Sequence, residues 1–185
     1  MRSSYSAVLR GGGENREHIV GIVASGKTTL ARRLSERLNI PWYELDRIVY
    51  HRIGNARYKR TPEEQYEVIQ EIDRQGAWIF EGTDRSSYRF LFEMADTVIF
   101  LDTPLWKRKI RIVTRFLKQN LGLEPCDYKP NLHMLKMMFK WTRDFEAGRE
   151  AFEARLRLCQ DKLIRLYDSD ELVFANTTGT STASR

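Results

Sequence analysis

Residues 21–29 read GIVASGKTT, and residues 30–38 continue as LARRLSERL. The stretch from Gly21 to Thr28 satisfies the pattern G-x-x-x-x-G-K-[ST] at every fixed position, and it lies between a short apolar run and a helix-like run. Glycines let backbone N–H groups curl around a phosphate, and the N-terminus of the following helix adds its positive dipole end. We therefore predict a phosphate-binding loop, with a coincidental glycine-rich turn as the alternative.

The polar residues of this loop have defined chemical roles in such a site. Lys27 can reach the β and γ oxygens of a nucleotide, and the Thr28 hydroxyl can bind Mg²⁺. Only Ile19 and Val20 precede Gly21 as apolar strand residues, which predicts a short first strand and weaker binding. The predicted nucleotide-binding residues of the loop are Gly21, Ala24, Ser25, Gly26, Lys27, Thr28 and Thr29.

Short apolar runs alternate with helix-period segments along the rest of the chain. The predicted strands are HIV (18–20), PWYEL (41–45), AWIF (77–80), TVIFL (97–101) and ELVFA (171–175). The predicted helices cover 27–38, a segment from the capping box at Thr61 to about Gly76, and then 104–120, 131–145 and 149–167. This alternation is typical of a buried parallel sheet, so we predict a three-layer α/β/α fold with five parallel strands and a helical lid between strands four and five.

Length and composition favour one domain. In this chain of 185 residues, we expect flexible ends at 1–16 and 176–185 and a lid-like helical region at 104–150. No apolar run approaches the ~20 residues of a membrane span, and the N-terminus lacks the apolar core of a secretory signal, so we expect a cytoplasmic protein. The two cysteines, Cys126 and Cys159, do not form a metal or disulfide pattern. The net charge of +6 indicates an anionic partner, either nucleic acid or a phosphorylated small molecule.

Acidic residues follow three of the predicted strands, at the edge where an open parallel sheet binds its ligands. Glu44 and Asp46 follow the second strand, Glu81 and Asp84 the third, and Asp102 the fourth. Glu81 comes directly after AWIF, so we expect it beside the phosphate loop, where its carboxylate can hold a water of the Mg²⁺ shell. A surface turn carboxylate is the alternative.

Residues 78–85 carry a family resemblance. WIFEGTDR resembles the strand and DGxPR signature of adenylate kinases and other nucleoside monophosphate kinases, with Glu81, Asp84 and Arg85 at the Asp, Pro and Arg positions. GKTTLARRLSERLNIPWYELDRIVYHR, RTPEEQ, WIFEG, ADTVIFLDTP and FKW are similar to stretches of bacterial topology modulation proteins, also described as adenylate-kinase-like AAA-family ATPases. The resemblance covers roughly residues 18–175. It implies a P-loop kinase-type fold that uses ATP and has a lid, and it leaves the acceptor open.

The segment after the second predicted strand is where kinases of this shape bind the acceptor. Its cations suit an anionic acceptor such as a nucleotide or a sugar phosphate, and solvated loop charges are the alternative. These cations are Arg47, Arg52, Arg57, Lys59 and Arg60. Asp46 leaves an alcohol acceptor open, because a carboxylate can orient an alcohol or take its proton, as in small-alcohol kinases resembling shikimate kinase. We expect the acceptor to enter beside Asp46 and Arg85.

Arginines of the long crossover are candidates for stabilising the transferring phosphoryl group. Arg108, Arg111 and Arg115 are spaced i, i+3 and i+7, which places them on one helix face. Arg143 and Arg149 resemble the arginines on the returning arm of a kinase lid. A solvated basic face is the alternative for the stripe.

Two further segments are candidates for binding the nucleobase. The aromatic and methionine residues of HMLKMMFKWTRDF (133–145) have a spacing that favours core packing over a base pocket. The segment LVFANTT resembles the last strand and the adenine loop of adenylate kinases, which makes Asn176 and Thr177 candidate adenine contacts.

We therefore predict an ATP-dependent phosphotransferase that moves the γ-phosphoryl group to a small acceptor, with Mg²⁺ at Thr28 and Glu81. The predicted catalytic residues are Lys27, Asp46, Arg85, Arg108, Arg111, Arg115, Arg143 and Arg149. The alternatives are a nucleotide-dependent nucleic-acid-binding regulator of DNA topology, an ATPase without a small-molecule acceptor, and a nucleotide binder without turnover. The sequence carries no helix-turn-helix, RNA-recognition or zinc-finger signature and does not specify an oligomeric state.

Overall fold

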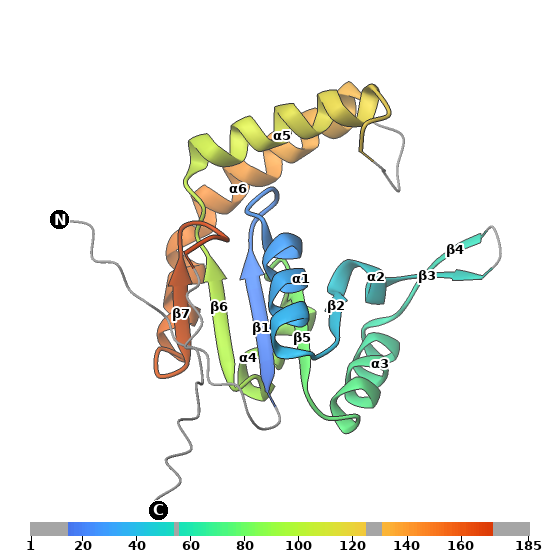
Figure 1. Cartoon of the computed structure of the whole chain (residues 1–185), viewed down its shortest axis with the longest axis vertical. Helices are drawn as coiled ribbons and strands as arrows, with labels where there is room; N and C mark the ends of the chain where they lie inside the picture. Colours follow the sequence, from blue (N-terminus) through green and yellow to red (C-terminus); the bar gives the residue numbers. More distant parts are fainter. Residues whose placement is uncertain (1–14, 54–55, 125–130, 172–185) are drawn as a thin grey trace, which may run out of the picture.

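The computed structural model describes residues 15–53, 56–124 and 131–171. Its centre is a five-stranded sheet in the order β2-β5-β1-β6-β7, with every neighbouring pair parallel (Figure 1). The strands are β1 (Arg16–Gly21), β2 (Trp42–Glu44), β5 (Trp78–Gly82), β6 (Thr97–Leu101) and β7 (Leu163–Leu166). The predicted sheet of five parallel strands is confirmed, with β1 at its centre.

Helices cover both faces of this sheet, which confirms the three-layer arrangement. On one face, Leu30 and Leu34 of α1 (Lys27–Leu38) pack against Ile19, Ile79 and Ile99. The other face is covered by α2 (Leu45–Val49), α3 (Pro62–Arg74), α4 (Leu91–Met94) and the end of α6 (Leu132–Arg157). Because both faces are buried, the central strands read as continuous apolar runs rather than as alternating ones.

The register brings the ends of the central strands to one edge of the sheet. Val20 pairs with Gly82, and Gly21 pairs with Leu101, so the segments that follow β1, β5 and β6 begin side by side. Side chains alternate between the faces of a strand, so Glu81 points to the same face as Ile79, which α1 covers. The sheet therefore places Glu81 next to the start of α1.

Two of the predicted strands differ from the structure. β1 has six residues, Arg16–Gly21, so the first strand is not short and this reason for weak nucleotide binding is removed. The fifth strand is β7, Leu163–Leu166, inside the segment 149–167 that was predicted as helix. The predicted strand 171–175 lies, apart from Glu171, outside the described residues.

The crossover between β6 and β7 is a pair of long helices. α5 (Leu105–Asn120) matches the predicted helix 104–120. α6 joins the predicted helix 131–145 to the first part of the predicted helix 149–167 without a break, and it ends at Arg157. Gly148 lies in the middle of α6, where it is exposed and a Cβ would meet no atom within 4 Å. The two helices extend beyond the edge of the sheet that carries the phosphate loop (Figure 1).

The segment between β2 and β5 contains a small hairpin that the sequence did not predict. It is formed by β3 (Tyr50–Ile53) and β4 (Ala56–Lys59), which pair antiparallel beside α2. The next helix, α3, starts at the predicted capping box, where the Thr61 side chain and the Glu64 backbone and side chain bond reciprocally. A short 3₁₀ turn, Ser86–Tyr88, follows β5.

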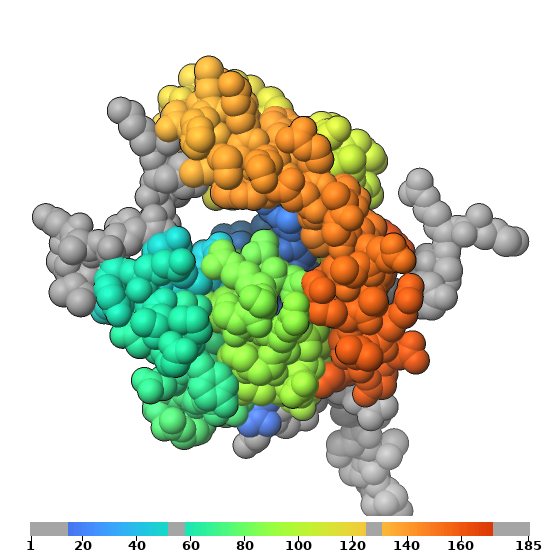
Figure 2. Space-filling view, turned by 180° about the vertical axis from the view of Figure 1, so that it is seen from behind, coloured from blue at the N-terminus to red at the C-terminus, as the bar shows by residue number. Residues whose placement is uncertain are grey.

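The space-filling view shows an opening between the α5 and α6 pair and the body of the molecule (Figure 2). In the part of the chain that the structure describes, none of the helices is long and apolar enough to cross a membrane.

Candidate active site

The phosphate loop has a backbone that glycine makes possible. A Cβ on Gly21 would lie 2.9 Å from the Leu101 carbonyl oxygen and 2.9 Å from the Ser25 hydroxyl, so a side chain would collide with the neighbouring strand. Gly26, directly before α1, has a φ of 103°, which disfavours any residue with a side chain. The loop is thus a cradle that a side chain at these positions would fill, which fits a bound phosphate.

The loop is also held from α5. The Ser25 carbonyl accepts hydrogen bonds from Thr103 Oγ1 at 2.8 Å and from Arg111 Nη1 at 2.7 Å. Arg111 Nη2 reaches Asp168 Oδ1 at 3.3 Å, in the turn after β7. Arg111 therefore connects the phosphate loop to the turn after β7, a positioning role that its sequence spacing did not reveal.

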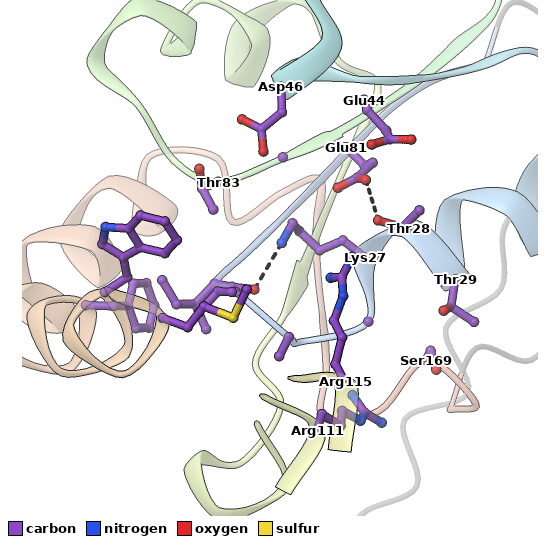
Figure 3. A pocket seen from close by; sticks show the side chains of 18 of the residues that line it. Lys27, Thr28, Thr29, Glu44, Asp46, Glu81, Thr83, Arg111, Arg115 and Ser169 are labelled. Carbon is purple, nitrogen blue, oxygen red and sulfur yellow. Dashed lines mark hydrogen bonds between the residues drawn. The ribbon is translucent and has the colours of Figure 1, made fainter. Parts of the chain in front are cut away.

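Lys27, Thr28 and Glu81 meet at the start of α1 (Figure 3). Lys27 Nζ donates to the Ile22 carbonyl at 3.0 Å, and the Thr28 hydroxyl donates to Glu81 Oε1 at 2.6 Å. Burial lowers the pKa of Lys27, and the carboxylates of Glu81 and Asp46 oppose this shift. Burial raises the pKa of Glu81, and Lys27 and Thr28 oppose it. Lys27 and Glu81 therefore stabilise each other in the charged form.

Thr28 and Glu81 fit the needs of a magnesium ion. Mg²⁺ prefers oxygen ligands and is usually held by one or two protein side chains together with water and substrate phosphates. The Thr28 hydroxyl and the Glu81 carboxylate are such oxygens, and they already lie within hydrogen-bond distance. Within 15–53, 56–124 and 131–171, the structure holds no group of three or more His, Cys, Asp or Glu side chains that forms a self-sufficient metal site.

Asp46 and Arg85 form an ion pair beyond the ends of the neighbouring strands β2 and β5. Asp46 lies in the first turn of α2 and Arg85 lies three residues after β5, and Arg85 Nη2 is 2.5 Å from Asp46 Oδ1. The side chains are 65% and 39% exposed, respectively, so both remain accessible from the cavity that they line. The two residues predicted to receive the acceptor are thus brought together.

The phosphate loop and the Asp46–Arg85 pair line one cavity of about 1170 Å³. Its opposite wall comes from α6, through Met138, Trp141 and Phe145. Met138 is 7% exposed and Phe145 packs on the core, in agreement with the core interpretation, whereas Trp141 is 40% exposed. The helical spacing of this segment favoured core packing over a pocket, but core and cavity positions share such a spacing, and all three side chains line the cavity.

The three predicted arginines of α5 differ in their surroundings. Arg111 and Arg115 line the cavity, whereas Arg108 is fully buried and donates to the Thr103 carbonyl and to Glu146. Arg108 does not line the cavity, because α6 covers the base of α5 where it lies. Arg115 is half exposed and pairs with Glu124 at 3.1 Å.

The two predicted arginines of α6, like Arg108, do not line the cavity. Arg143 is exposed, and Arg149 is bound to Asp102 at 2.9 Å and to Glu146 at 3.0 Å. Arg165 of β7 binds the other oxygen of Asp102 at 3.1 Å. This network joins α6 to the ends of β6 and β7, so Arg149 helps to hold α6 against the sheet.

The turn after β7 supplies cavity residues that were not predicted from the sequence. Asp168, Ser169 and Asp170 line the cavity beside the phosphate loop, and Lys107 donates to Asp168 at 2.8 Å. The signal in the sequence was LIRLYDSD (163–170), a strand-like run followed by a polar turn. The candidates Asn176 and Thr177 lie outside the described residues.

Two of the cations expected around the acceptor bind other groups of the protein. Arg47 is 74% exposed and pairs with Glu44 at 3.1 Å, and Arg60 binds the Ile48 carbonyl at 2.9 Å. Neither they nor Lys59 line the cavity, and the side chains of Arg52 and Arg57 lie outside the described part of the chain.

A comparison of the sequence with models of known protein families finds no match, and a comparison with curated proteins finds none either. Similar solved structures include kinases. Shikimate kinase from Acinetobacter baumannii in complex with shikimate is 17% identical with a TM-score of 0.49, over 84% of this chain and 83% of that chain. A putative fructose transport system kinase from Silicibacter sp. TM1040 is 17% identical with a TM-score of 0.49, over 77% and 89%. Shikimate kinase from Aquifex aeolicus vf5 is 20% identical with a TM-score of 0.40, over 84% and 86%. Such similarity does not identify a reaction or a substrate.

Proposed function

We propose that this chain is an ATP-dependent kinase of small molecules, of the adenylate-kinase-like group that its sequence resembles, with the α5 and α6 pair as the lid of a single domain. The observation that carries the proposal is one cavity that holds both a phosphate loop and an acid paired with an arginine. The loop contributes Lys27 and the Thr28 and Glu81 oxygens, and the opposite side contributes Asp46 and Arg85.

The nucleotide half binds the phosphates of ATP. Backbone N–H groups of the loop and the N-terminus of α1 bind the β and γ phosphates, and Lys27 adds a positive charge. Thr28 and Glu81 would hold Mg²⁺, which supplies positive charge to the phosphate oxygens when bound. The turn at 168–170 closes this half on the side away from Asp46.

The acceptor half presents a hydroxyl group to the γ-phosphorus. The bond between the acceptor oxygen and phosphorus forms, the bond between phosphorus and the β–γ bridging oxygen breaks, and ADP leaves. The Asp46 carboxylate takes the hydroxyl proton, and Arg85 holds Asp46 Oδ1 in place. Arg115, which lines the cavity from α5, adds charge near the transferring group.

The lid contributes by excluding water. A site closed by the α6 wall protects the transferring phosphoryl group from hydrolysis and strengthens electrostatic interactions inside it. The network of Arg149 with Asp102 and Glu146 positions this wall over the sheet.

The test is ADP release from Mg²⁺·ATP with a panel of nucleoside monophosphates, sugars, hydroxy acids and duplex DNA, using the native chain and Lys27→Ala. We expect one small molecule to stimulate turnover and Lys27→Ala to reduce it about 100-fold or more, as for loss of one transition-state donor. Lys136→Ala is the matched control, because Lys136 is exposed on α6 and does not line the cavity.

Two outcomes would contradict the kinase proposal. If only duplex DNA stimulates turnover, with an affinity that falls steeply with salt, the chain is a nucleotide-dependent nucleic-acid-binding regulator. If ATP binds and no partner stimulates turnover, the chain is an ATPase or a nucleotide binder without an acceptor.

A further inference from the structure

The half of the cavity around Asp46 is acidic. Among the described residues that line the cavity from the ends of β2 and β5, from the first turn of α1 and from α6, five are carboxylates and two are cations. The carboxylates are Glu44, Asp46, Glu81, Asp84 and Asp144, and the cations are Lys27 and Arg85. Lys27 belongs to the phosphate loop and Arg85 is paired with Asp46, so both cations already have a function.

Three of these carboxylates form ion pairs with cations that do not line the cavity. Glu44 is bound by Arg47 at 3.1 Å, Asp84 by Arg155, and Asp144 by Lys140 at 2.5 Å. A phosphate or carboxylate group entering this half would therefore approach a surface of negatively charged oxygens, and the cavity-lining cations near it are Lys27, Arg85 and Arg115, which the phosphate loop, Asp46 and Glu124 already engage. Like charges brought together in this way disfavour binding.

The wall formed by α6 is apolar except for Asp144. Met138, Trp141 and Phe145 line the cavity from α6, and Trp141 keeps 40% of its surface exposed. The face of an aromatic ring packs against the apolar face of another ring and attracts a nearby cation. An acceptor in this half lies between an apolar wall and an acidic one.

We infer that the acceptor is an alcohol without negative charge that carries an apolar or ring-shaped face, and that amine-bearing alcohols of this kind are preferred. The inference rests on the proposed kinase function and replaces the anionic acceptor suggested by the arginines of the segment after β2. Its hydroxyl lies at Asp46, its ring at Trp141, and its amine near Asp144 or Asp84.

The experiment uses acceptors that share a scaffold and differ in charge. One set is 2-amino-1-phenylethanol, 1-phenyl-1,2-ethanediol and mandelate, and a second is glucosamine, glucose and glucuronate. Adenosine and AMP form a third pair. Transfer of phosphate from labelled ATP is measured for each at pH 7.5, with ATP binding measured separately by calorimetry.

We expect kcat/KM to fall in the order amine, neutral, anion, with the anion about 10-fold or more below the neutral member of its set. Asp144→Asn should raise KM for the amines several-fold and leave KM for the neutral alcohols unchanged, while kcat changes little. Glu150→Gln is the matched control, because Glu150 is exposed on the same helix and does not line the cavity. Trp141→Ala should raise KM for every ring-bearing acceptor.

The possible failures are distinct. If AMP, mandelate or glucuronate is the best member of its set, the inference about charge is wrong and the kinase function stands. If no alcohol receives phosphate although ATP binds, both the inference and the kinase function are wrong. Equal KM changes for amines and neutral alcohols in Asp144→Asn would also overturn the role given to this carboxylate.

Discussion

Replacing Glu17 by glutamine should stabilise the protein at pH 8 and leave its stability almost unchanged at pH 4. Glu17 lies on β1, only 3% exposed, between Ile79 of β5 and Thr97 of β6. Burial raises its pKa from 4.5 to about 7, a hydrogen bond with Thr97 opposes this shift, and the charge of Asp96 adds to it. The folded protein therefore prefers the neutral carboxyl.

The size of the effect follows from this pKa. A rise from 4.5 to about 7 corresponds to about 3 kcal/mol, at about 1.4 kcal/mol for each pKa unit. A folded pKa above the unfolded one gives a contribution to stability that is complete below pH 4.5 and is lost as the pH rises through 7. Glutamine has no charge to lose, so Glu17→Gln should gain up to about 3 kcal/mol over the native chain at pH 8.

Urea unfolding followed by circular dichroism at pH 4, 6 and 8 measures this difference. Glu67→Gln, an exposed glutamate on α3, is the control and should show no pH-dependent difference from the native chain. His18, whose pKa burial lowers to about 4, is present in all three proteins, so its own acid destabilisation cancels. A Glu17→Gln protein that is equally stabilised at pH 4 and pH 8, or is destabilised at pH 8, would refute the reasoning.

Two other substitutions test the site. Gly26→Ala should destabilise the fold by about 1 to 3 kcal/mol and weaken ATP binding, because the φ of 103° strains any side chain. Gly148→Ala, at an exposed helical glycine with open space around it, should instead stabilise the fold by about 1 kcal/mol. Thermal unfolding measures the stability of both variants, and titration with ATP measures their nucleotide affinity. Glu81→Gln should raise the Mg²⁺ concentration needed for half-maximal turnover about 10-fold, because an amide is a weaker magnesium ligand than a carboxylate. An unchanged Mg²⁺ dependence of ADP release would remove Glu81 from the metal site.

Elements with strong local signals were predicted closely. α1 begins and ends at the expected residues because Leu30 and Leu34 lie on one face and Gly26 precedes the first turn. β6 and the start of α3 also lie where they were predicted, because each has a strong local signal. In β6 the signal is a continuous apolar run, and in α3 it is the Thr61 capping box. These signals act within a few residues, so a sequence displays them completely.

The fifth strand shows where such signals stop. LIRL (163–166) and LVFA (172–175) are both short apolar runs, and the second was predicted to be the fifth strand. In the structure Leu163–Leu166 pairs with Val98 to Leu101 of β6, at the point where α6 and its following turn return the chain to the sheet. The length of α6 decides which run reaches β6.

The arginines of α5 show the same limit in the site. Their spacing correctly placed Arg108 and Arg115 on one face of a helix, yet one is buried and the other lines the cavity. Seven residues separate them by about 10 Å along the axis, and α6 covers only the first position. The sequence by itself determined the phosphate loop, the helix that follows it and the alternation of strands and helices, since each depends on neighbouring residues. Only the tertiary structure decided that Asp46 meets Arg85 and that Glu81 meets Thr28, because these contacts join residues that are 39 and 53 positions apart in the chain.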